Sequence, residues 1–372
     1  MSEWKTYKLR DVVNILDYKR IPLSSRQREQ RRGKYPYYGA QGIIDYIDDY
    51  IFDGTYLLVA EDGENLRSKK QHIAQLVSGK YWVNNHAHIL ESNGLCDIRY
   101  ICYLLNVFDI SGYITGSAQP KLNQANLLAI EISLPPLAEQ KRIADILSAI
   151  DDKIELNRRI NANLEQQAQA LFDEYFIHNI GKLGNYSTAS LTDIAQFLNG
   201  LAMQKFRPKG NEDGIPVLKI KELGQGKCDA SSDLCSASIP EEYIINNGDI
   251  VFSWSGTLLV DIWCSGICGL NQHLFKVSPL NYPKWLIYFW TKYHLSNFIR
   301  IAQDKAVTMG HIKRGDLDAA KVIIPSAESL NELDKIMSPM LQSIISNRIE
   351  NNNLSTLRDT LLPKLMNGEI TV

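Results

Sequence analysis

The sequence predicts a mixed α/β (α+β) fold in which one unit occurs twice, each time as a globular module followed by a long helix. A helical apolar repeat near the middle of the chain returns near the C-terminus, and the segments before each repeat share motifs in the same order. Internal self-similarity of this kind is typical of a duplicated unit. We therefore expect the two long helices to pair within the chain.

The first long helix is predicted from the apolar spacing of residues 143–175. Its seam alternates steps of four and three residues without a helix breaker, and eight of its ten positions are apolar or aromatic: Ile143, Leu147, Ile150, Ile154, Asn157, Asn161, Leu164, Ala168, Leu171 and Tyr175. This spacing is typical of a coiled-coil seam. The matching positions of the second copy keep the same phase: Leu333, Met337, Met340, Ile344, Asn347, Asn351, Leu354, Arg358, Leu361 and Leu365.

Two asparagines interrupt each seam at matching positions. Antiparallel pairing places Asn157 opposite Asn351. It also places Asn161 opposite Asn347. Buried polar residues at seam positions cost stability but fix register. We therefore expect these four residues to set the register of an intramolecular antiparallel coiled coil with an internal pseudo-two-fold. The alternative is that they face solvent where the helices splay apart.

The first module should contain a helix, a basic loop, several strands and a second helix. The spacing of apolar residues predicts a helix over 7–16, and the loop covers 19–34. Short β-like runs separated by Asp-Gly and Asn-Gly turn signals predict strands at 43–47, 55–60, 74–79 and 86–90. A helix over 98–107 and a last strand before Pro135 complete the module.

The second module repeats this order. LTDIAQFL (191–198) matches LRDVVNIL (9–16), and NQH (271–273) matches NNH (84–86). The separation between matched motifs grows along the module, which indicates small net insertions. We predict four divisions of the chain: module 1 over 1–136, a coiled-coil helix over 137–180, module 2 over 181–324 and a second coiled-coil helix over 325–372.

The bulk composition is that of an ordinary soluble protein, with 45% hydrophobic and 22% charged residues and a formal net charge of −2. No global field attracts it to nucleic acid or membrane, so any basic surface must be local. The six cysteines form no CxxC pair and no zinc set, so we expect reduced thiols and no metal. No apolar run reaches the roughly 18–20 residues that cross a bilayer, which favours a cytoplasmic protein without a membrane partner.

The basic loop has the composition of a phosphate-binding segment. It holds seven basic residues against one acid, Glu29: Lys19, Arg20, Arg26, Arg28, Arg31, Arg32 and Lys34. Arginine is also the side chain best suited to read guanine with two hydrogen bonds. A second cluster consists of Arg67, Lys69 and Lys70, and weaker candidates are Lys205, Arg207, Lys219 and Lys221. The alternative for each residue is a solvated charge.

Matched loops just before each long helix supply further candidates for DNA contact: Gln119 and Lys121 in module 1, and Thr308, His311, Lys313 and Arg314 in module 2. Their place beside the helices suits contact with the DNA backbone or groove. His86 and His273 recur at matching positions and could be structural or touch DNA. Trp254 could stack or wedge, or pack in a core.

The helical segments carry a family resemblance. Residues 134–172 read LPPLAEQKRIADILSAIDDKIELNRRINANLEQQAQALF, and residues 354–370 read LSTLRDTLLPKLMNGEI. They resemble the central and distal conserved regions of the specificity (S) subunit of type I restriction-modification systems. YPYYGAQGIIDYIDDYIFDGTYLLVAEDG (35–63) and GIPVLKIKEL (214–223) resemble segments of that family's target recognition domains. The resemblance covers nearly the whole chain.

This resemblance implies a DNA sequence-specificity subunit without catalytic activity. In the family, two target recognition domains each read one part of a split double-stranded DNA sequence. The paired helices separate these domains and dock two methyltransferase (M) subunits, and restriction (R) subunits join the full enzyme. In this chain SAESLNELDKI (326–336) departs from the PLAEQKRI wording of the first copy. The two docking surfaces are therefore not expected to be equal in detail.

The residues themselves show no enzyme motif. We find no methyltransferase (D/N/S)PP(Y/F) motif, no Walker A loop, no HExxH and no complete dinucleotide loop, so we expect no catalytic residue and no cofactor. Two other readings stay open. One is a stand-alone DNA-binding regulator with internal pseudo-dimer symmetry, and the other is a coiled-coil scaffold that does not bind DNA.

Overall fold

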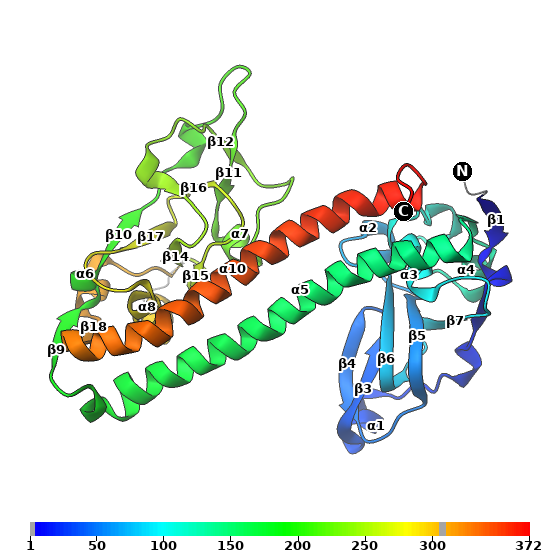
Figure 1. Ribbon diagram of the computed structural model, residues 1–372, viewed down its shortest axis with the longest axis horizontal. Coiled ribbons are helices and arrows are strands. Elements are labelled where there is room, and N and C mark those ends of the chain that lie inside the picture. The colour runs from blue at the N-terminus through cyan, green and yellow to red at the C-terminus, as the bar shows by residue number, and fades with distance from the viewer. Residues whose placement is uncertain (1–3, 305–309) are drawn as a thin grey trace. The chain divides into compact units, whose positions relative to one another are not determined.

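The computed structural model describes residues 4–304 and 310–372 and divides into two compact units, taken here one at a time (Figure 1). The first unit consists of Met1–Asp152 and Thr356–Val372, and the second of Lys153–Ser355. The helices α5 (Leu137–Phe172) and α10 (Ala327–Met366) contribute to both units. The division at the helix ends that the sequence predicts remains a prediction.

A six-stranded sheet forms the centre of the first unit, in the order β2-β7-β5-β6-β3-β4. All its neighbours are antiparallel except β3 and β6, and a separate antiparallel pair joins β1 to β8. The strands are β1 (Lys5–Lys8), β2 (Val13–Ile15), β3 (Arg32–Gly39), β4 (Gly42–Ile47), β5 (Phe52–Ala60), β6 (Ala74–Val83), β7 (Ala87–Ser92) and β8 (Glu131–Leu134).

Apolar residues on both faces of β5 are buried in this unit. Leu57 and Val59 join one cluster with α3 and with parts of α5 and α10, whereas Leu58 joins a second cluster on the opposite face. The alternation follows from the two-residue period of a strand. The helices of the unit, apart from α5 and α10, are α1 (Ser25–Gln30), α2 (Asn65–Ser68), α3 (Ile98–Val107) and α4 (Gln124–Ala129).

The second unit contains two four-stranded sheets, in the orders β10-β17-β14-β15 and β12-β11-β16-β13, and a separate pair of β9 with β18. The strands are β9 (Tyr186–Ser190), β10 (Ala195–Asn199), β11 (Ile215–Leu218), β12 (Leu234–Cys235), β13 (Ile244–Ile245), β14 (Ile250–Ser253), β15 (Leu259–Ile262), β16 (Cys268–Leu270), β17 (Leu274–Pro279) and β18 (Lys321–Pro325). Its shorter helices are α6 (Leu191–Ile194), α7 (Ile220–Gln225), α8 (Lys284–Asp304) and α9 (Arg314–Ala319).

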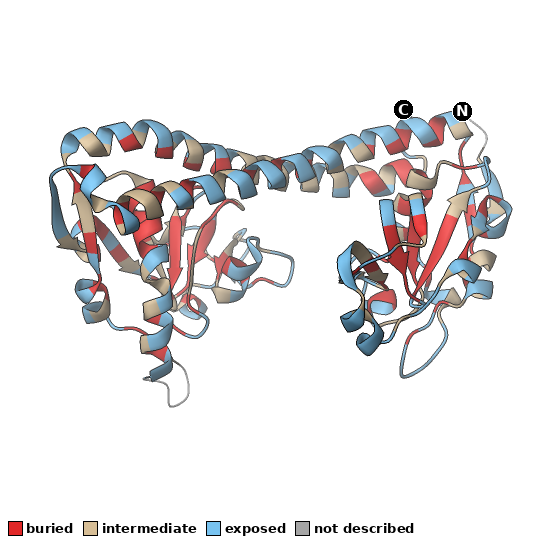
Figure 2. Ribbon diagram, turned by 90° about the horizontal axis from the view of Figure 1, so that it is seen from below, coloured by how far each residue is buried: buried red, intermediate tan, exposed pale blue. Residues whose placement is uncertain are grey.

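Aromatic packing joins the end of α5 to α8 in the core of the second unit. Phe172 stacks on Phe176 with ring centroids 4.9 Å apart and on Phe289 at 5.5 Å. Trp290 meets Phe172 edge-on at 5.1 Å. Figure 2 shows buried residues concentrated on the sheets and on the helix faces that cover them.

The strand orders confirm that the chain contains an internal repeat. The run β10-β17-β14-β15 of the second unit corresponds, strand for strand, to β2-β7-β5-β6 of the first. Likewise, the first strand of each module pairs with the last strand before the long helix, as β1 with β8 and β9 with β18. One topology therefore serves both units.

Two local predictions at the N-terminus are wrong. Residues 7–16 do not form a helix: they form the end of β1, a short 3₁₀ turn (Leu9–Asp11) and β2. Pairing with β8 and β7 overrides the helical spacing, which is a weak signal in so short a segment. The segment 19–34 is not an open loop either, because it contains α1 and the start of β3.

Within the described residues, no helix combines the length and the apolar character that crossing a membrane requires.

Candidate nucleic-acid interface

Arg20 lies in a half-buried cluster of charges, although the sequence places it in the basic segment. Its guanidinium donates a hydrogen bond to Glu61 at 2.8 Å and pairs with Asp17 at 3.0 Å, and only 15% of its side chain is exposed. His88 Nδ1 lies 2.5 Å from the Asp17 carboxylate. Lys121 pairs with Glu61 at 3.2 Å. We call these five residues the charged cluster of the first unit.

The charged cluster contains one group of potential metal ligands, Asp17, Glu61 and His88, whose ligand atoms lie within 4.8 Å of one another. Arg20 and Lys121 already compensate both carboxylates, so a metal ion there would meet two fixed positive charges. Burial acts to raise the pKa of Glu61. The hydrogen bond from Arg20, the charge of His88 and the hydrogen bond from Lys121 outweigh it and lower that pKa. The cluster is therefore an ion-pair network.

Two further arginines of the basic segment are also held by acids. Arg28 pairs with Asp45 at 3.0 Å, and Arg31 pairs with Asp48 at 2.9 Å. Arg31 also lies over the Trp82 ring at 5.0 Å. These contacts fasten α1 to β4 and to the turn after it. The side chains that the segment leaves exposed are Lys19, Arg26, Arg32 and Lys34.

The second basic cluster supports the loop that carries Gln119. Arg67 donates to the carbonyl oxygens of Gly116 at 2.5 Å and Ser117 at 3.1 Å. Gly116 has φ +85°, and a Cβ there would lie 2.2 Å from the carbonyl oxygen of Gln119, so only glycine fits this turn. Lys69 donates to the Phe108 carbonyl at 2.6 Å. Gln119 and Lys70 are exposed.

The two matched histidines lie in equivalent turns. His86 Nδ1 is 2.7 Å from an Asp62 carboxylate oxygen, and His273 Nδ1 is 2.9 Å from the Ser255 hydroxyl. In each turn an asparagine side chain accepts a hydrogen bond from the histidine backbone N–H: Asn84 at 2.8 Å for His86, and Asn271 at 3.3 Å for His273. Both histidines have a structural partner and remain partly exposed.

Two basic candidates of module 2 lie at one hollow with Asn271. Arg207 and Lys219 line a hollow of about 380 Å³ together with Gln204 and Asn271. Lys219 forms an ion pair with Asp233. Lys221 donates to the Ser231 hydroxyl at 2.9 Å and, like Lys205, is exposed. Lys219 is the N-cap of α7, and Lys221 is the second residue of that helix.

The loop with the last candidates lies between α8 and α9, not directly before α10 as the sequence predicts; it is described only in part, and Thr308 lies outside the described residues. His311 forms a β-bridge with Ser255, as Lys121 does with Asp62 in the first unit. Lys313 precedes α9 and Arg314 is its first residue, and both side chains are exposed. Arg314 borders a hollow of about 570 Å³ that Trp254 and Phe275 also line.

The four asparagines lie between α5 and α10 in the predicted antiparallel pairs. Asn157 Nδ2 donates to Asn351 Oδ1 at 2.9 Å. Asn347 Nδ2 donates to Asn161 Oδ1 at 2.9 Å. Asn161 and Asn351 each donate to a backbone carbonyl of the opposite helix, Ile344 at 3.1 Å and Ile154 at 3.2 Å. These four bonds match between equivalent residues of the two copies, whereas the further bond from Asn157 Nδ2 to Glu350 at 2.7 Å has no counterpart among the described residues. Asn157 and Asn161 are buried.

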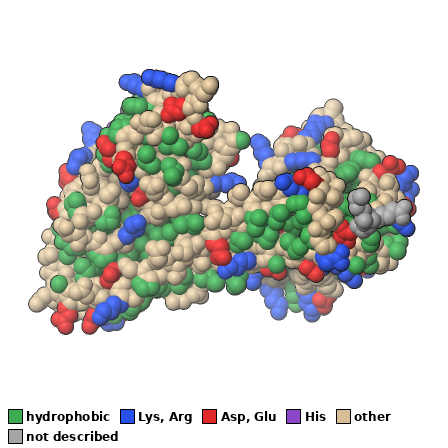
Figure 3. Space-filling view, turned by 45° about the horizontal axis from the view of Figure 1, so that its top comes forward, with side chains coloured by type: hydrophobic (Ala, Val, Ile, Leu, Met, Phe, Trp, Pro, Cys, Tyr) green, Lys and Arg blue, Asp and Glu red, His purple; other side chains and the backbone are tan. Residues whose placement is uncertain are grey.

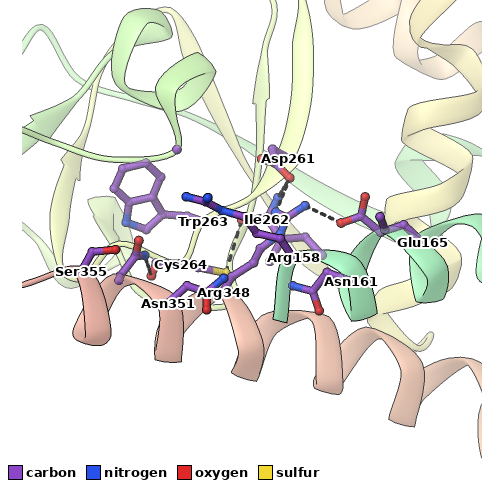
Figure 4. A pocket seen from close by; sticks show the side chains of 13 residues that line it. Arg158, Asn161, Glu165, Asp261, Ile262, Trp263, Cys264, Arg348, Asn351 and Ser355 are labelled. Atoms are coloured by element: carbon purple, nitrogen blue, oxygen red, sulfur yellow. Dashed lines mark hydrogen bonds and ion pairs between the residues drawn. The ribbon is translucent and has the colours of Figure 1, made fainter. Parts of the chain in front are cut away.

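Arg348 ties the helices to module 2 beside the asparagines (Figure 4). Its guanidinium donates to Asp261 of β15 and to Glu165 of α5, each at 2.8 Å. Burial opposes its charge, but Asp261 and Glu165 outweigh this and raise its pKa. A hollow of about 370 Å³ lies here, and Arg158 on its wall forms no hydrogen bond or ion pair with any residue that the structure describes.

The charges on the molecular surface are mixed. On the face shown in Figure 3, Lys and Arg side chains lie among Asp and Glu side chains and form no single continuous basic field. On this face, affinity for a polyanion would therefore come from local groups of exposed cations.

Comparison with known proteins gives consistent matches. The family model for the type I restriction modification DNA specificity domain matches residues 1–166 and again 184–358. A Haemophilus influenzae protein named as a type I restriction enzyme specificity subunit is 31% identical over 342 residues, which are 90% of this chain and 86% of that one. The type I restriction enzyme MjaIX specificity subunit of Methanocaldococcus jannaschii is 26% identical over 415 residues, covering 100% of this chain and 94% of that one.

A solved structure shares the fold. The S subunit of a type I restriction-modification system from M. genitalium superposes with a TM-score of 0.67 at 16% identity, covering 98% of this chain and 96% of that one. These matches do not favour a stand-alone regulator.

Sequence reasoning missed Arg348, Asn199 and Phe275. The positional match between the two modules was available as a signal. Asn199 directly follows LTDIAQFL as Asp17 follows LRDVVNIL, and Phe275 stands at the same distance from NQH as His88 from NNH. The long-range partners of Arg348 could not be read from spacing alone.

Proposed function

Because the chain belongs to the type I restriction-modification DNA specificity family, we propose that its two modules read the two parts of a split double-stranded DNA target. The observation that carries this proposal is the repeat of one module topology within one chain, each copy matched by the same family model. Two similar readers in one chain suit two half-sites. In this role the chain supplies recognition and has no catalytic residue of its own.

The proposed DNA contacts are candidate cations and one amide, Gln119, whose side chains are exposed. In module 1 these are Lys19, Arg26, Arg32, Lys34, Lys70, Gln119 and the half-exposed Lys121. In module 2 they are Lys205, Arg207, Lys221, Lys313 and Arg314. Arg20, Arg28, Arg31 and Arg67 support them, since acids or backbone carbonyls engage their guanidinium groups. Phosphate contacts supply affinity and position, and base-edge contacts supply sequence.

The helices α5 and α10 are proposed to set the spacing between half-sites and to dock methyltransferase subunits, two per chain, with restriction subunits joining the full complex. Each helix is continuous over its whole range. Several large apolar residues on them remain exposed, including Ile146, Leu156, Ile160, Ile336 and Leu357. Apolar positions left open on paired helices are suited to a protein partner.

Co-expression with a methyltransferase (M) subunit of a type I system from the same genome tests the proposal. We expect the two to co-purify and to methylate genomic DNA at one split sequence, which methylation mapping reads directly. Arg207→Ala, with Arg300→Ala on α8 as the control, should weaken DNA binding at the site without loss of complex formation. Failure to form a complex, or a complex that methylates no defined sequence, would overturn the proposal.

A further inference from the structure

One site is built in two different ways in the two units. The backbone around it is equivalent. Leu122 N–H donates to Glu61 O at 2.8 Å in the first unit, and Ile312 N–H donates to Trp254 O at 3.1 Å in the second. The N–H groups of Glu61 and Trp254 in turn donate to the carbonyls of the matched histidines, at 2.9 and 3.3 Å. Trp254 therefore occupies the position of Glu61.

The neighbours of these two residues correspond as well. The alignment of the matched motifs places Asn199 where the first unit has Asp17, and Phe275 where it has His88. The matched β-bridges place His311 where it has Lys121. The charged cluster of the first unit is thus replaced in the second by an amide, two aromatic rings and a histidine.

The two versions differ in whether the site is open. In the first unit the ion pairs of Arg20 and Lys121 with Glu61, and of His88 with Asp17, occupy it. In the second unit the site borders the hollow of about 570 Å³, which we call the Trp254 hollow. Its wall includes Phe197 and Tyr243, and its rim carries Asn199, Gln196 and Arg314.

The walls of the Trp254 hollow are suited to a flat aromatic ligand. The Trp254 and Phe275 rings lie 5.8 Å apart at 32°, and Phe275 is in turn braced edge-on by Phe197 at 5.9 Å. Trp254 Nε1 donates to Asn199 Oδ1 at 2.9 Å, which fixes the indole and leaves the Asn199 amide N–H groups directed to other acceptors. Trp254 is only half-buried, so part of its ring can accept a stacking partner.

The polar rim narrows the ligand class. Asparagine and glutamine amides recognise base edges, and arginine suits phosphate. Within the described residues Arg314 forms no hydrogen bond or ion pair, so its guanidinium is available. The volume is in the range of small-molecule sites, about 300–1,000 Å³. Stacking rings, amide donors and a cation together match a nucleotide, with its base on Trp254 and its phosphate at Arg314.

We propose that the Trp254 hollow is a nucleotide-binding site in the second unit, and that the charged cluster abolishes the equivalent site in the first. The ligand is either a base that leaves the DNA stack or a free nucleotide, which share this chemistry. The first of these ligands, a base that leaves the DNA stack, rests on the proposed function. Stacking one base gains roughly 5- to 150-fold in affinity. Extruding a paired base costs a comparable amount, so an unpaired base should be preferred.

Nucleotide binding to the purified full-length chain tests the site directly. The probes are dAMP, dGMP, dCMP and TMP, with ribose 5-phosphate and inorganic phosphate as controls, followed by calorimetry and NMR. We expect saturable binding of at least one nucleotide that neither control reproduces. Trp254→Ala should weaken it more than tenfold, and Trp254→Phe less. Arg314→Ala should weaken it several-fold, whereas Arg300→Ala, which replaces another exposed arginine, should not. Equal competition by ribose 5-phosphate would overturn the role of the base.

A second arm distinguishes the two sources. A duplex containing the mapped target is compared with the same duplex carrying a single-base bulge or mismatch at each position in turn. If the ligand is a base of the DNA, the chain should bind about tenfold more tightly when the bulge or mismatch lies at one particular position. This gain should be lost in Trp254→Ala, and hydrogen exchange should show that the module of this variant is still folded. If the ligand is a free nucleotide, nucleotides should bind, but no position of the bulge or mismatch should tighten DNA binding.

The outcomes separate this proposal from the proposed function. If the chain binds target DNA but binds no nucleotide and prefers no unpaired base, the hollow is not a nucleotide site and the function stands. If nucleotides bind as expected but the chain with its methyltransferase partner recognises no DNA sequence, the function fails and the site stands.

Discussion

The two copies of the repeat are alike at the asparagines of the helix pair and unlike at the site that Glu61 and Trp254 occupy. At the helix pair, the asparagine–asparagine and asparagine–carbonyl hydrogen bonds of one copy have counterparts in the other. At the site of Glu61 and Trp254, the first unit has an ion-pair network and the second unit has an aromatic hollow. A buried ion-pair network depends on all its members, whereas an aromatic hollow keeps its walls when one rim residue is lost. Equivalent backbone can therefore carry either the charged cluster or the open Trp254 hollow.

The largest difference is expected from replacing the matched residues Asp17 and Asn199 with alanine. Asp17→Ala leaves Arg20 and His88 without a charge partner, in a place where only 6% of the Asp17 side chain is exposed, and it should cost about 3–5 kcal/mol. Asn199→Ala removes one acceptor from the half-exposed Trp254 and should cost about 0.5–1.5 kcal/mol. Hydrogen exchange on peptides from β5 and β14 measures each unit separately.

Asp17→Asn is the matched control, since it gives the first unit the residue type that the second unit has. It keeps an acceptor for the Ile89 N–H, now 3.0 Å from Asp17, but removes the charge. A cost close to that of Asp17→Ala assigns the effect to charge. Equal losses of stability in Asp17→Ala and Asn199→Ala would contradict the proposed difference between the charged cluster and the Trp254 hollow.

A second comparison uses Arg348 and its repeat counterpart Arg158. Arg348→Met leaves Asp261 and Glu165 without their shared cation, and because 29% of the arginine side chain is exposed we expect a loss of about 1–3 kcal/mol. Arg158→Met should change stability by less than about 0.5 kcal/mol. Urea denaturation of the two variants measures the difference. Similar values would mean that the Arg348 contacts contribute little to the packing of module 2 on the helices.

The helix pair and most strands could be predicted from sequence, because their signals are periodic and local. The helix at 98–107 and the strand around 43–47 follow from spacing and turn residues within a few positions. The pairing of Asn157 with Asn351 follows from the phase of the seams together with an internal two-fold, which makes the helices antiparallel. By contrast, residues 7–16 take their structure from β7 and β8, which lie far away along the chain, and no local pattern encodes that pairing.

For the candidate site, the sequence predicts only which segments are rich in basic residues. The density of cations between Lys19 and Lys34 predicts a basic segment, but Arg20, Arg28 and Arg31 meet acids that come from distant strands and turns. Which cations stay exposed is decided by those tertiary partners, and spacing does not reveal them. The replacement of the charged cluster by the Trp254 hollow becomes visible only when the two units are compared in three dimensions.

Where the copies are alike, matched substitutions should have equal effects. Asn161→Ala and Asn351→Ala each remove a donor to a carbonyl of the opposite helix and an acceptor for a partner asparagine. We expect each to cost about 1–2 kcal/mol, because one amide between the helices loses its asparagine partner, although Asn157 still donates to Glu350 after Asn351→Ala. Urea denaturation measures both.

Replacing all four asparagines with leucine should leave the helices paired at equal or higher stability but loosen their register. Disulfide crosslinking between cysteines introduced on α5 and α10 should then show several pairings in place of one. A single crosslinked pairing would show that the apolar seam sets the register by itself.

The smallest expected difference between the units is in their response to acid. Burial would raise the pKa of Glu61, but Arg20, His88 and Lys121 together lower it from its ordinary value of 4.5. A carboxyl group whose pKa falls on folding contributes stability that is fully present above its unfolded pKa and is lost as pH falls through the folded one. The urea midpoint of the first unit, followed by NMR signals from β5, should therefore decrease more steeply below about pH 4.5 in the wild type than in Glu61→Gln.

In the second unit Trp254 stands at this position and does not titrate, so Trp254→Phe should leave the pH dependence of β14 signals unchanged. A Glu61→Gln profile parallel to the wild type would show that the charged cluster contributes no pH-dependent stability.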